Sequence, residues 1–140
     1  MKKVVGIFTV MVLMVFCGMQ SASAKVNPER LLGTWENVHV MPNGAVAGKT
    51  AIQLTAAGTY TWAFYMVAAD KTAVDKGYWH VDGDKLIFTN RQKENMVFKV
   101  ISVDHNNLRV IDDGDDDVTF RLASPNVIST YPNQYDSSSK

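Results

Sequence analysis

The stretch Leu31-Leu32-Gly33-Thr34-Trp35 decides the fold that this sequence predicts. The residues before it indicate one short helical turn, because Pro28 is favoured at the first helical position and Asn27 is a good cap before it. Gly33 allows a sharp bend, and Trp35 then opens a strand. An indole directly after a turn is suited to plug one end of a small β-barrel, where its ring is buried and its N–H still reaches a partner. A core tryptophan in another kind of β-domain is the alternative.

The first 24 residues have the pattern of a secretory signal peptide. Lys2 and Lys3 form a positive start, and residues 4–18 are almost entirely apolar. Ala22-Ser23-Ala24 then supplies the small residues that a signal peptidase reads. We therefore expect cleavage before Lys25 and a periplasmic or secreted protein.

A retained membrane anchor is less favoured, because the apolar run is short for the roughly 20 residues that span a bilayer. We therefore expect no stable membrane span after cleavage. Lipid attachment at Cys17 is also less favoured, since the bulky Phe16 precedes it where such processing requires a small residue.

Cleavage leaves 116 of the 140 residues, which is enough for one domain with a single core. It removes two of the 14 basic residues, so 12 face 14 acidic ones, and it removes the only cysteine. This balance, without a basic stripe, argues against nucleic acid as a partner. An exported chain without disulfides relies on its apolar core, which is typical of a bacterial envelope protein.

Short β-prone segments separated by turn residues follow the tryptophan. The expected strands cover residues 35–41, 50–54, 59–66, 77–81, 85–89, 96–103, 108–111 and 118–122. No long helical run separates them, which favours sequential antiparallel pairing. The sequence therefore predicts an all-β fold, a small eight-stranded antiparallel up-and-down barrel after a short N-terminal helical turn. A two-sheet sandwich is the rival architecture.

Turn signals and composition set the remaining boundaries. Asp82-Gly83-Asp84 between two β-rich runs is a strong hairpin signal, and the polar residues 67–76 indicate the longest connection. Beyond Ser124-Pro125 the composition changes to Ser, Asn, Pro and Tyr, which predicts a tail without structure of its own. The expected division is a signal peptide (1–24), a barrel domain (25–123) and a flexible C-terminal tail (124–140).

These residues resemble the lipocalin-like, calycin-type bacterial domains, over about Pro28 to Leu122. The matching stretches are LLGTW at 31–35, GTY at 58–60, GYWHVDGDKL at 77–86 and the late strand with Arg121.

The resemblance implies an eight-stranded barrel with Gly33 and Trp35 at its closed end. It also implies that Arg121 packs over Trp35 through cation–π and hydrogen-bond contacts. The chain departs from the family in its short strands and in lacking the usual helix after the barrel.

Six aromatic residues form the candidate ligand-binding set. They are Tyr60, Trp62 and Phe64, which share one strand face by the two-residue period, and Phe88, Phe98 and Phe120 from later strands. Such rings line pockets for apolar small molecules. The alternative is that they fill the barrel completely, as happens in small barrels.

The polar residues indicate no assembled metal site. His39, His80 and His105 lack metal-ligand spacing, and we expect His80 to point outward because its neighbours Trp79 and Val81 point inward. The carboxylates within 112–117 offer oxygens for Ca²⁺, but the run lacks the EF-hand glutamate and reads more simply as a charged hairpin tip.

Two functional hypotheses follow. The first is an exported lipocalin-like binding protein that takes up a small hydrophobic ligand in the barrel. The second is a non-enzymatic interaction or inhibitor module with a filled barrel, which contacts an envelope protein through Tyr65, Met66 and the loop 67–76. We expect neither an enzyme nor a cofactor, since no nucleophile with a base and no paired carboxylates are apparent.

Overall fold

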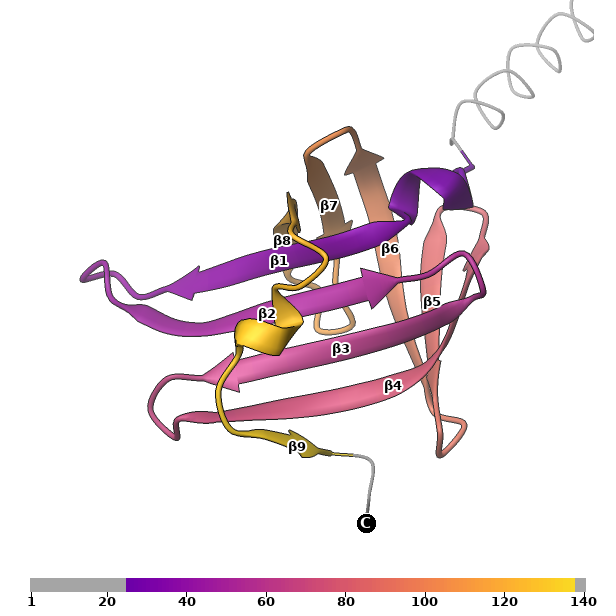
Figure 1. Ribbon diagram of the computed structural model, residues 1–140. Coiled ribbons are helices and arrows are strands. Elements are labelled where there is room, and N and C mark those ends of the chain that lie inside the picture. Colours follow the sequence, from indigo (N-terminus) through magenta and orange to yellow (C-terminus); the bar gives the residue numbers. More distant parts are fainter. Residues whose placement is uncertain (1–24, 138–140) are drawn as a thin grey trace, which may run out of the picture.

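The computed structural model describes residues 25–137, so the predicted signal peptide lies outside the described residues (Figure 1). Two 3-10 turns and nine strands make up the described chain. Their bounds are η1 Pro28–Leu31, β1 Gly33–Val40, β2 Val46–Leu54, β3 Thr59–Met66, β4 Lys71–Asp82, β5 Lys85–Asn90, β6 Asn95–Val103, β7 Asn107–Ile111, β8 Asp117–Ala123, η2 Ile128–Thr130 and β9 Gln134–Asp136.

The first eight strands form a closed antiparallel up-and-down barrel. Each strand pairs with the next in the chain, and pairing of β1 with β8 closes the cylinder. The predicted fold class is thereby confirmed, and the two-sheet sandwich is excluded. The short ninth strand adds to β4 from outside, in parallel.

The start of the barrel follows the local signals in the sequence. The side chain of Asn27 accepts the backbone N–H of Glu29 at 3.1 Å and so caps η1. Trp35 is 1% exposed, and its indole Nε1–H donates to the carbonyl oxygen of Leu31 at 2.8 Å. The ring is thus buried with its polar atom satisfied, as the plug hypothesis requires.

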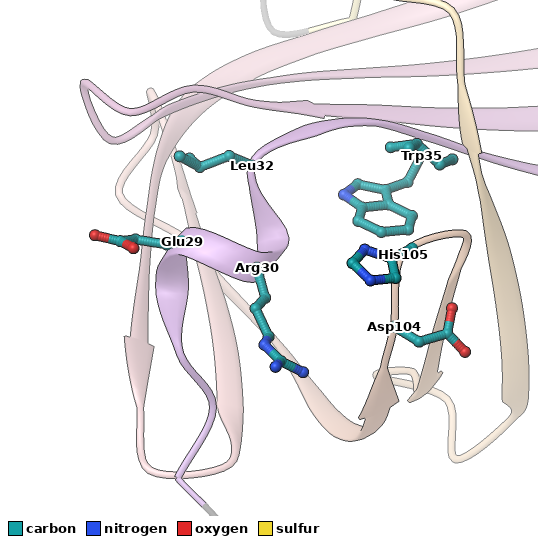
Figure 2. Close-up of a pocket in the computed structure, with 7 residues that line it drawn as sticks. Glu29, Arg30, Leu32, Trp35, Asp104 and His105 are labelled. Atoms are coloured by element: carbon teal, nitrogen blue, oxygen red, sulfur yellow. The ribbon is translucent and has the colours of Figure 1, made fainter.

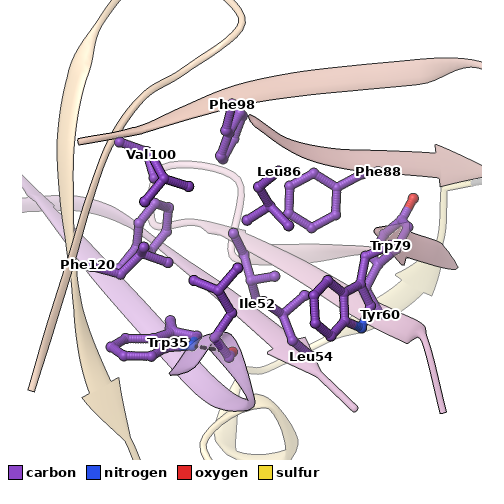
Figure 3. Close-up of a cluster of buried hydrophobic side chains, with 13 residues drawn as sticks. Trp35, Ile52, Leu54, Tyr60, Trp79, Leu86, Phe88, Phe98, Val100 and Phe120 are labelled. Atoms are coloured by element: carbon purple, nitrogen blue, oxygen red, sulfur yellow. Dashed lines mark hydrogen bonds between the residues drawn. The ribbon is translucent and has the colours of Figure 1, made fainter. Parts of the chain in front are cut away.

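The barrel interior holds the main hydrophobic cluster (Figure 3). Inward-facing residues of all eight barrel strands contribute to it, together with Leu31 from η1. Its buried members are Leu31, Trp35, Ile52, Leu54, Tyr60, Trp79, Leu86, Phe88, Phe98, Val100, Leu108, Val110 and Phe120.

The fourth strand is longer than predicted, because residues 71–76 belong to it. The irregular connection spans only Val67 to Asp70, and Met66 already pairs with Lys71. Thr72 is fully buried although the segment is polar, since the C-terminal segment covers it. The prediction of a long loop over 67–76 was therefore wrong.

Two hairpins project beyond the barrel and form what we call the arm, residues 37–50 and 63–76. On one side, β1 pairs with β8 only over Thr34–Glu36 but continues beside β2 to Val40. On the other side, β4 pairs with β5 only from Gly77 onward. The four strands β1 to β4 therefore extend together past the closed cylinder (Figure 1).

Gly77 lies where β4 passes from the arm into the barrel. A Cβ atom there would lie 2.1 Å from the carbonyl oxygen of Thr89 and 2.8 Å from a ring carbon of Tyr60. Only glycine permits this close approach of β5 and the Tyr60 ring.

The segment after β8 packs on the outside of the barrel, which corrects the prediction of a flexible tail. Tyr131 is 5% exposed and lies against Ala51 of β2 and Ala63 of β3. Figure 1 shows the segment crossing these two strands. The small alanines leave room for the tyrosine ring, so burial of that ring offsets the cost of ordering the segment.

Hydrogen bonds fix the same segment at two further points. The Tyr131 hydroxyl donates to the Glu36 carboxylate, and burial together with that carboxylate raises the pKa of Tyr131. The ninth strand then pairs with Thr72–Val74 of β4. The outer edge of β4 in the arm is therefore covered by the chain itself.

Candidate functional site

The six predicted ligand-binding residues all face inward, but most of them form the core. Tyr60, Phe88, Phe98 and Phe120 are only 2–3% exposed, whereas Trp62 and Phe64 are half-buried. Four of the rings pack edge to face, with centroid separations of 5.1–5.4 Å in the pairs Tyr60–Phe88, Trp62–Phe88, Trp62–Phe98 and Phe88–Phe98.

This edge-to-face arrangement is the preferred contact of aromatic side chains. Phe64 lies apart from the four rings, in the arm, where it meets the His39 ring at 5.8 Å. The arrangement therefore favours a filled barrel over an open ligand cavity.

Arg121 does not occupy the place that the resemblance implied. The register pairs Trp35 with Leu122 and Glu36 with Arg121. Because paired residues share a face, Leu122 lies on the tryptophan side and the exposed Arg121 lies on the outer face. The expectation that Arg121 packs over Trp35 was therefore wrong, because the next residue, Leu122, is the one that shares a face with Trp35.

A groove of about 330 Å³ lies at the closed end of the barrel, beside the tryptophan plug (Figure 2). Leu32 and Leu122 give it an apolar floor and are 36% and 48% exposed. Arg30 on η1 lies on one side, and Asp104 and His105 of the β6–β7 turn lie on the other.

The Asp104 carboxylate in that groove stabilises the β6–β7 turn. It accepts the backbone N–H groups of Asn106 and Asn107 at 2.9 and 2.8 Å, and these bonds lower the pKa of Asp104. The groove thus has acidic and basic side chains around apolar residues, and its lining favours no one class of ligand.

A smaller hollow of about 170 Å³ opens at the other end, and we call it the mouth pocket. Three predicted residues, Tyr60, Trp62 and Phe88, form its inner wall. Its polar and outer lining consists of Asp75, Asn90, Glu94, Asn95, Met96 and Asp113.

Hydrogen bonds organise this mouth pocket. The Tyr60 hydroxyl donates to Oδ2 of Asp75 at 2.9 Å, and burial together with that carboxylate raises the pKa of Tyr60. In the β5–β6 turn, the Asn90 amide donates to Glu94 at 3.2 Å, and the Thr89 hydroxyl donates to Asn95 at 2.8 Å. The polar side chains at the rim are therefore held by their neighbours.

The acidic run 112–117 forms a structured hairpin tip. One oxygen of Asp112 accepts the backbone N–H groups of Gly114 and Asp116, each at 2.9 Å, and Asp117 pairs with Arg109. Within residues 25–137, no three His, Cys, Asp or Glu side chains are grouped so as to hold a metal ion. The local hydrogen bonds give the run a role in shaping the turn.

The arm carries the exposed apolar side chains that the sequence hypothesis assigned to Tyr65 and its neighbours. Tyr65 itself is half-buried, packs near Tyr131 and donates to Asp70 at 3.0 Å. The exposed apolar residues lie instead at the arm's tip and along its β1 side: Val38, Val40, Met41, Val46 and Val67.

The β1 edge of the arm has hydrogen-bonding groups on one side that no described strand engages. Beyond Glu36, β1 has β2 as a neighbour, and the Asn37 side chain donates to the Thr119 carbonyl at 2.8 Å where the strands part. His39 turns inward and contacts the Thr50 hydroxyl at 2.9 Å. Sequence reasoning missed this edge, because strand partners are set by the closure of the barrel.

Among the described residues, we find no helix with the length and apolarity to cross a membrane. No protein-family model matches the sequence, and no curated protein matches it either. Among solved structures, the Cpx pathway activator NlpE from Escherichia coli superposes with a TM-score of 0.45 at 18% identity. The superposition covers 66% of this chain and 46% of that one, so the chain spans under half of that protein's length.

Proposed function

We propose that this chain is an exported, lipocalin-like protein of the cell envelope that acts as a non-enzymatic interaction module. The signal-peptide pattern of residues 1–24 supports export, and the eight-stranded barrel with Trp35 at its closed end supports the lipocalin-like relationship. The contact surface in this proposal is the arm, and the partner offers an extended segment.

The observation that carries this proposal is the open edge of β1 in the arm. Over residues 37–40 the strand has β2 on one side, and alternate backbone N–H and C=O groups point to the other. Val38 and Val40 are 40% and 60% exposed. An extended segment of a partner would gain main-chain hydrogen bonds along this edge and apolar contact with the valines.

The packed interior supports the same proposal. Phe88 and Phe98 are buried against each other and against Trp62 inside the barrel. A ligand of ordinary drug size needs a site of roughly 300–1,000 Å³. Uptake of such a molecule into the barrel would require these rings to move out of their contacts.

Photo-crosslinking in cells tests the proposed contact surface. A photoreactive amino acid at Val40 is expected to give a covalent adduct with one defined envelope protein. The matched control is Ile101, which is 43% exposed but lies on β6, away from the arm. Proline at position 38 or at position 37 removes one backbone N–H of β1. Because alternate backbone N–H groups of a strand point to opposite sides, one of the two variants, Val38→Pro or Asn37→Pro, removes an N–H from the open edge, and that variant should weaken the adduct. Equal adducts from positions 40 and 101, or none from 40, would contradict the proposal.

A second candidate function is the binding of a small molecule at the mouth pocket. The observation that favours it is the hollow itself, whose wall contains Tyr60, Trp62 and Phe88 from the predicted ligand-binding set. Titration of small molecules against the fluorescence of Trp62 tests this candidate, with Trp62→Phe separating its signal from those of the other tryptophans.

A further inference from the structure

We propose that the mouth pocket binds a compact primary alkylammonium group. The inference concerns the end of the barrel away from the tryptophan plug and does not depend on the β1 edge of the arm. It rests on three features of the pocket, namely its aromatic wall, the charge of its lining and an aspartate that faces inward.

The aromatic wall offers ring surface to a cation. Trp62 is half-buried at the pocket and packs edge to face with Phe88 at a centroid separation of 5.3 Å, and Tyr60 packs with Phe88 in the same way at 5.1 Å. Aromatic rings attract an ammonium group placed over their faces, and tryptophan does so most strongly. The wall therefore suits an ammonium group as well as the carbon chain attached to it.

The charge of the lining has one sign. Three of the described lining residues are acids, Asp75, Glu94 and Asp113, and none is Lys or Arg. An anionic ligand would meet repulsion from these carboxylates, and a neutral apolar ligand would remove water from them without replacing its hydrogen bonds. A cation is the ligand that compensates both effects.

Asp75 is the residue whose carboxylate accepts the ammonium group in this proposal. It pairs with Trp62 across β3 and β4, so its side chain lies on the inward face with the indole. It is half-buried, and the Tyr60 hydroxyl fixes its Oδ2 at 2.9 Å. The other oxygen, Oδ1, retains lone pairs for a donor in the pocket.

The size of the hollow limits the ligand. Its volume of about 170 Å³ is below the range of drug-sized sites, which begins at roughly 300 Å³. A short alkyl chain on the aromatic wall, with its ammonium group at Asp75, meets this limit. A primary ammonium has three N–H donors, which match the carboxylates and the amide oxygens of the rim.

Two sources share this chemistry, a free small amine and the side chain of a lysine in a peptide. We would titrate the full mature chain with n-butylammonium chloride and, in parallel, with a lysine derivative blocked at both backbone ends. The readout is the NMR shift of the Trp62 indole N–H. Saturation by butylammonium indicates a free amine, and saturation by the lysine derivative alone indicates a peptide; either result supports the site.

Variants and a neutral ligand supply the controls. Asp75→Asn keeps an acceptor for the Tyr60 hydroxyl but removes the charge, so it should fold normally and bind about tenfold more weakly or worse. The matched control is Asp82→Asn, an exposed acid of the same strand outside the pocket, which should change binding less than about twofold.

Three results would overturn the site. They are saturation by 1-butanol at the same concentrations as butylammonium, equal binding by wild type and Asp75→Asn, and an absence of saturable shifts with both amines. Each leaves the crosslinking result at the arm unaffected, so the two proposals fail separately.

Discussion

The barrel interior and the arm differ in how completely the chain covers its own strands. In the interior, side chains of all eight barrel strands cover one another, and Leu31 and Trp35 close one end. In the arm, the C-terminal segment covers the outer face through Tyr131 and the β4 edge through β9. No described segment pairs with the β1 edge beyond Glu36.

The two edges of the arm arise in the same way, but only one of them is paired with another segment of the described chain. Each edge exists because a strand outlasts its barrel neighbour, β4 beyond β5 and β1 beyond β8. Exposed edges invite pairing with other chains, so proteins usually cover or blunt them. Here the chain covers one edge with its own C-terminal strand, and no described segment pairs with the other.

The largest loss of stability is expected from a substitution in the barrel interior. Trp35→Ala removes the fully buried plug and the hydrogen bond to Leu31, so the free energy of unfolding should fall by about 3–5 kcal/mol. Urea titration followed by far-UV circular dichroism measures it. A loss below about 1 kcal/mol would show that the indole does not support the core.

A smaller effect is expected where the chain covers the arm. Tyr131→Ala removes the ring that fills the space over Ala51 and Ala63, and the free energy of unfolding should fall by about 2–3 kcal/mol. Amide hydrogen exchange should also rise along β9 and Thr72–Val74. Unchanged stability and exchange would mean that the C-terminal segment does not dock in solution.

The hydroxyl of the same tyrosine separates packing from hydrogen bonding. Tyr131→Phe keeps the ring and loses the bond to Glu36, so we expect a loss of about 1–2 kcal/mol in the same titration. Glu36→Gln, which retains an acceptor, is the matched control and should cost less. A loss for Tyr131→Phe equal to that for Tyr131→Ala would contradict the assignment of stability to ring burial.

The smallest effect on stability is expected at the open edge. Val38→Lys and Val40→Lys change side chains that are already exposed, so each should alter the free energy of unfolding by less than about 0.5 kcal/mol. With the photoreactive amino acid at position 40, Val38→Lys should nevertheless reduce crosslinking from the arm. A large loss of stability would mean that the valines support the fold and are not a surface for a partner.

Local patterns predicted much of the fold. The cap at Asn27, the buried Trp35 and the Gly83 hairpin each depend on a few neighbouring residues, and the structure has all three. Strand parity also placed the ring of Phe88 inside and His80 outside, because a two-residue period fixes both faces at once.

The errors concern contacts between residues far apart in the sequence. The docking of Tyr131 depends on the small size of Ala51 and Ala63, which no local pattern around the tyrosine reveals. Arg121 was placed by resemblance, whereas the β1–β8 register puts Leu122 opposite Trp35. Three rings of the predicted aromatic set line the mouth pocket, but its acids come from β4, the β5–β6 turn and the β7–β8 turn, which no local pattern brings together.

A xenon titration tests most directly the claim that the interior is filled by the protein's own side chains. Xenon enters dry apolar cavities, so its effect on the methyl NMR shifts of Val100 and Val110 reports free space inside the barrel. We predict small, linear shifts for the wild type and saturable shifts for Leu86→Ala, in which a fully buried side chain is truncated. Saturable shifts in the wild type would reveal an internal cavity and contradict the account.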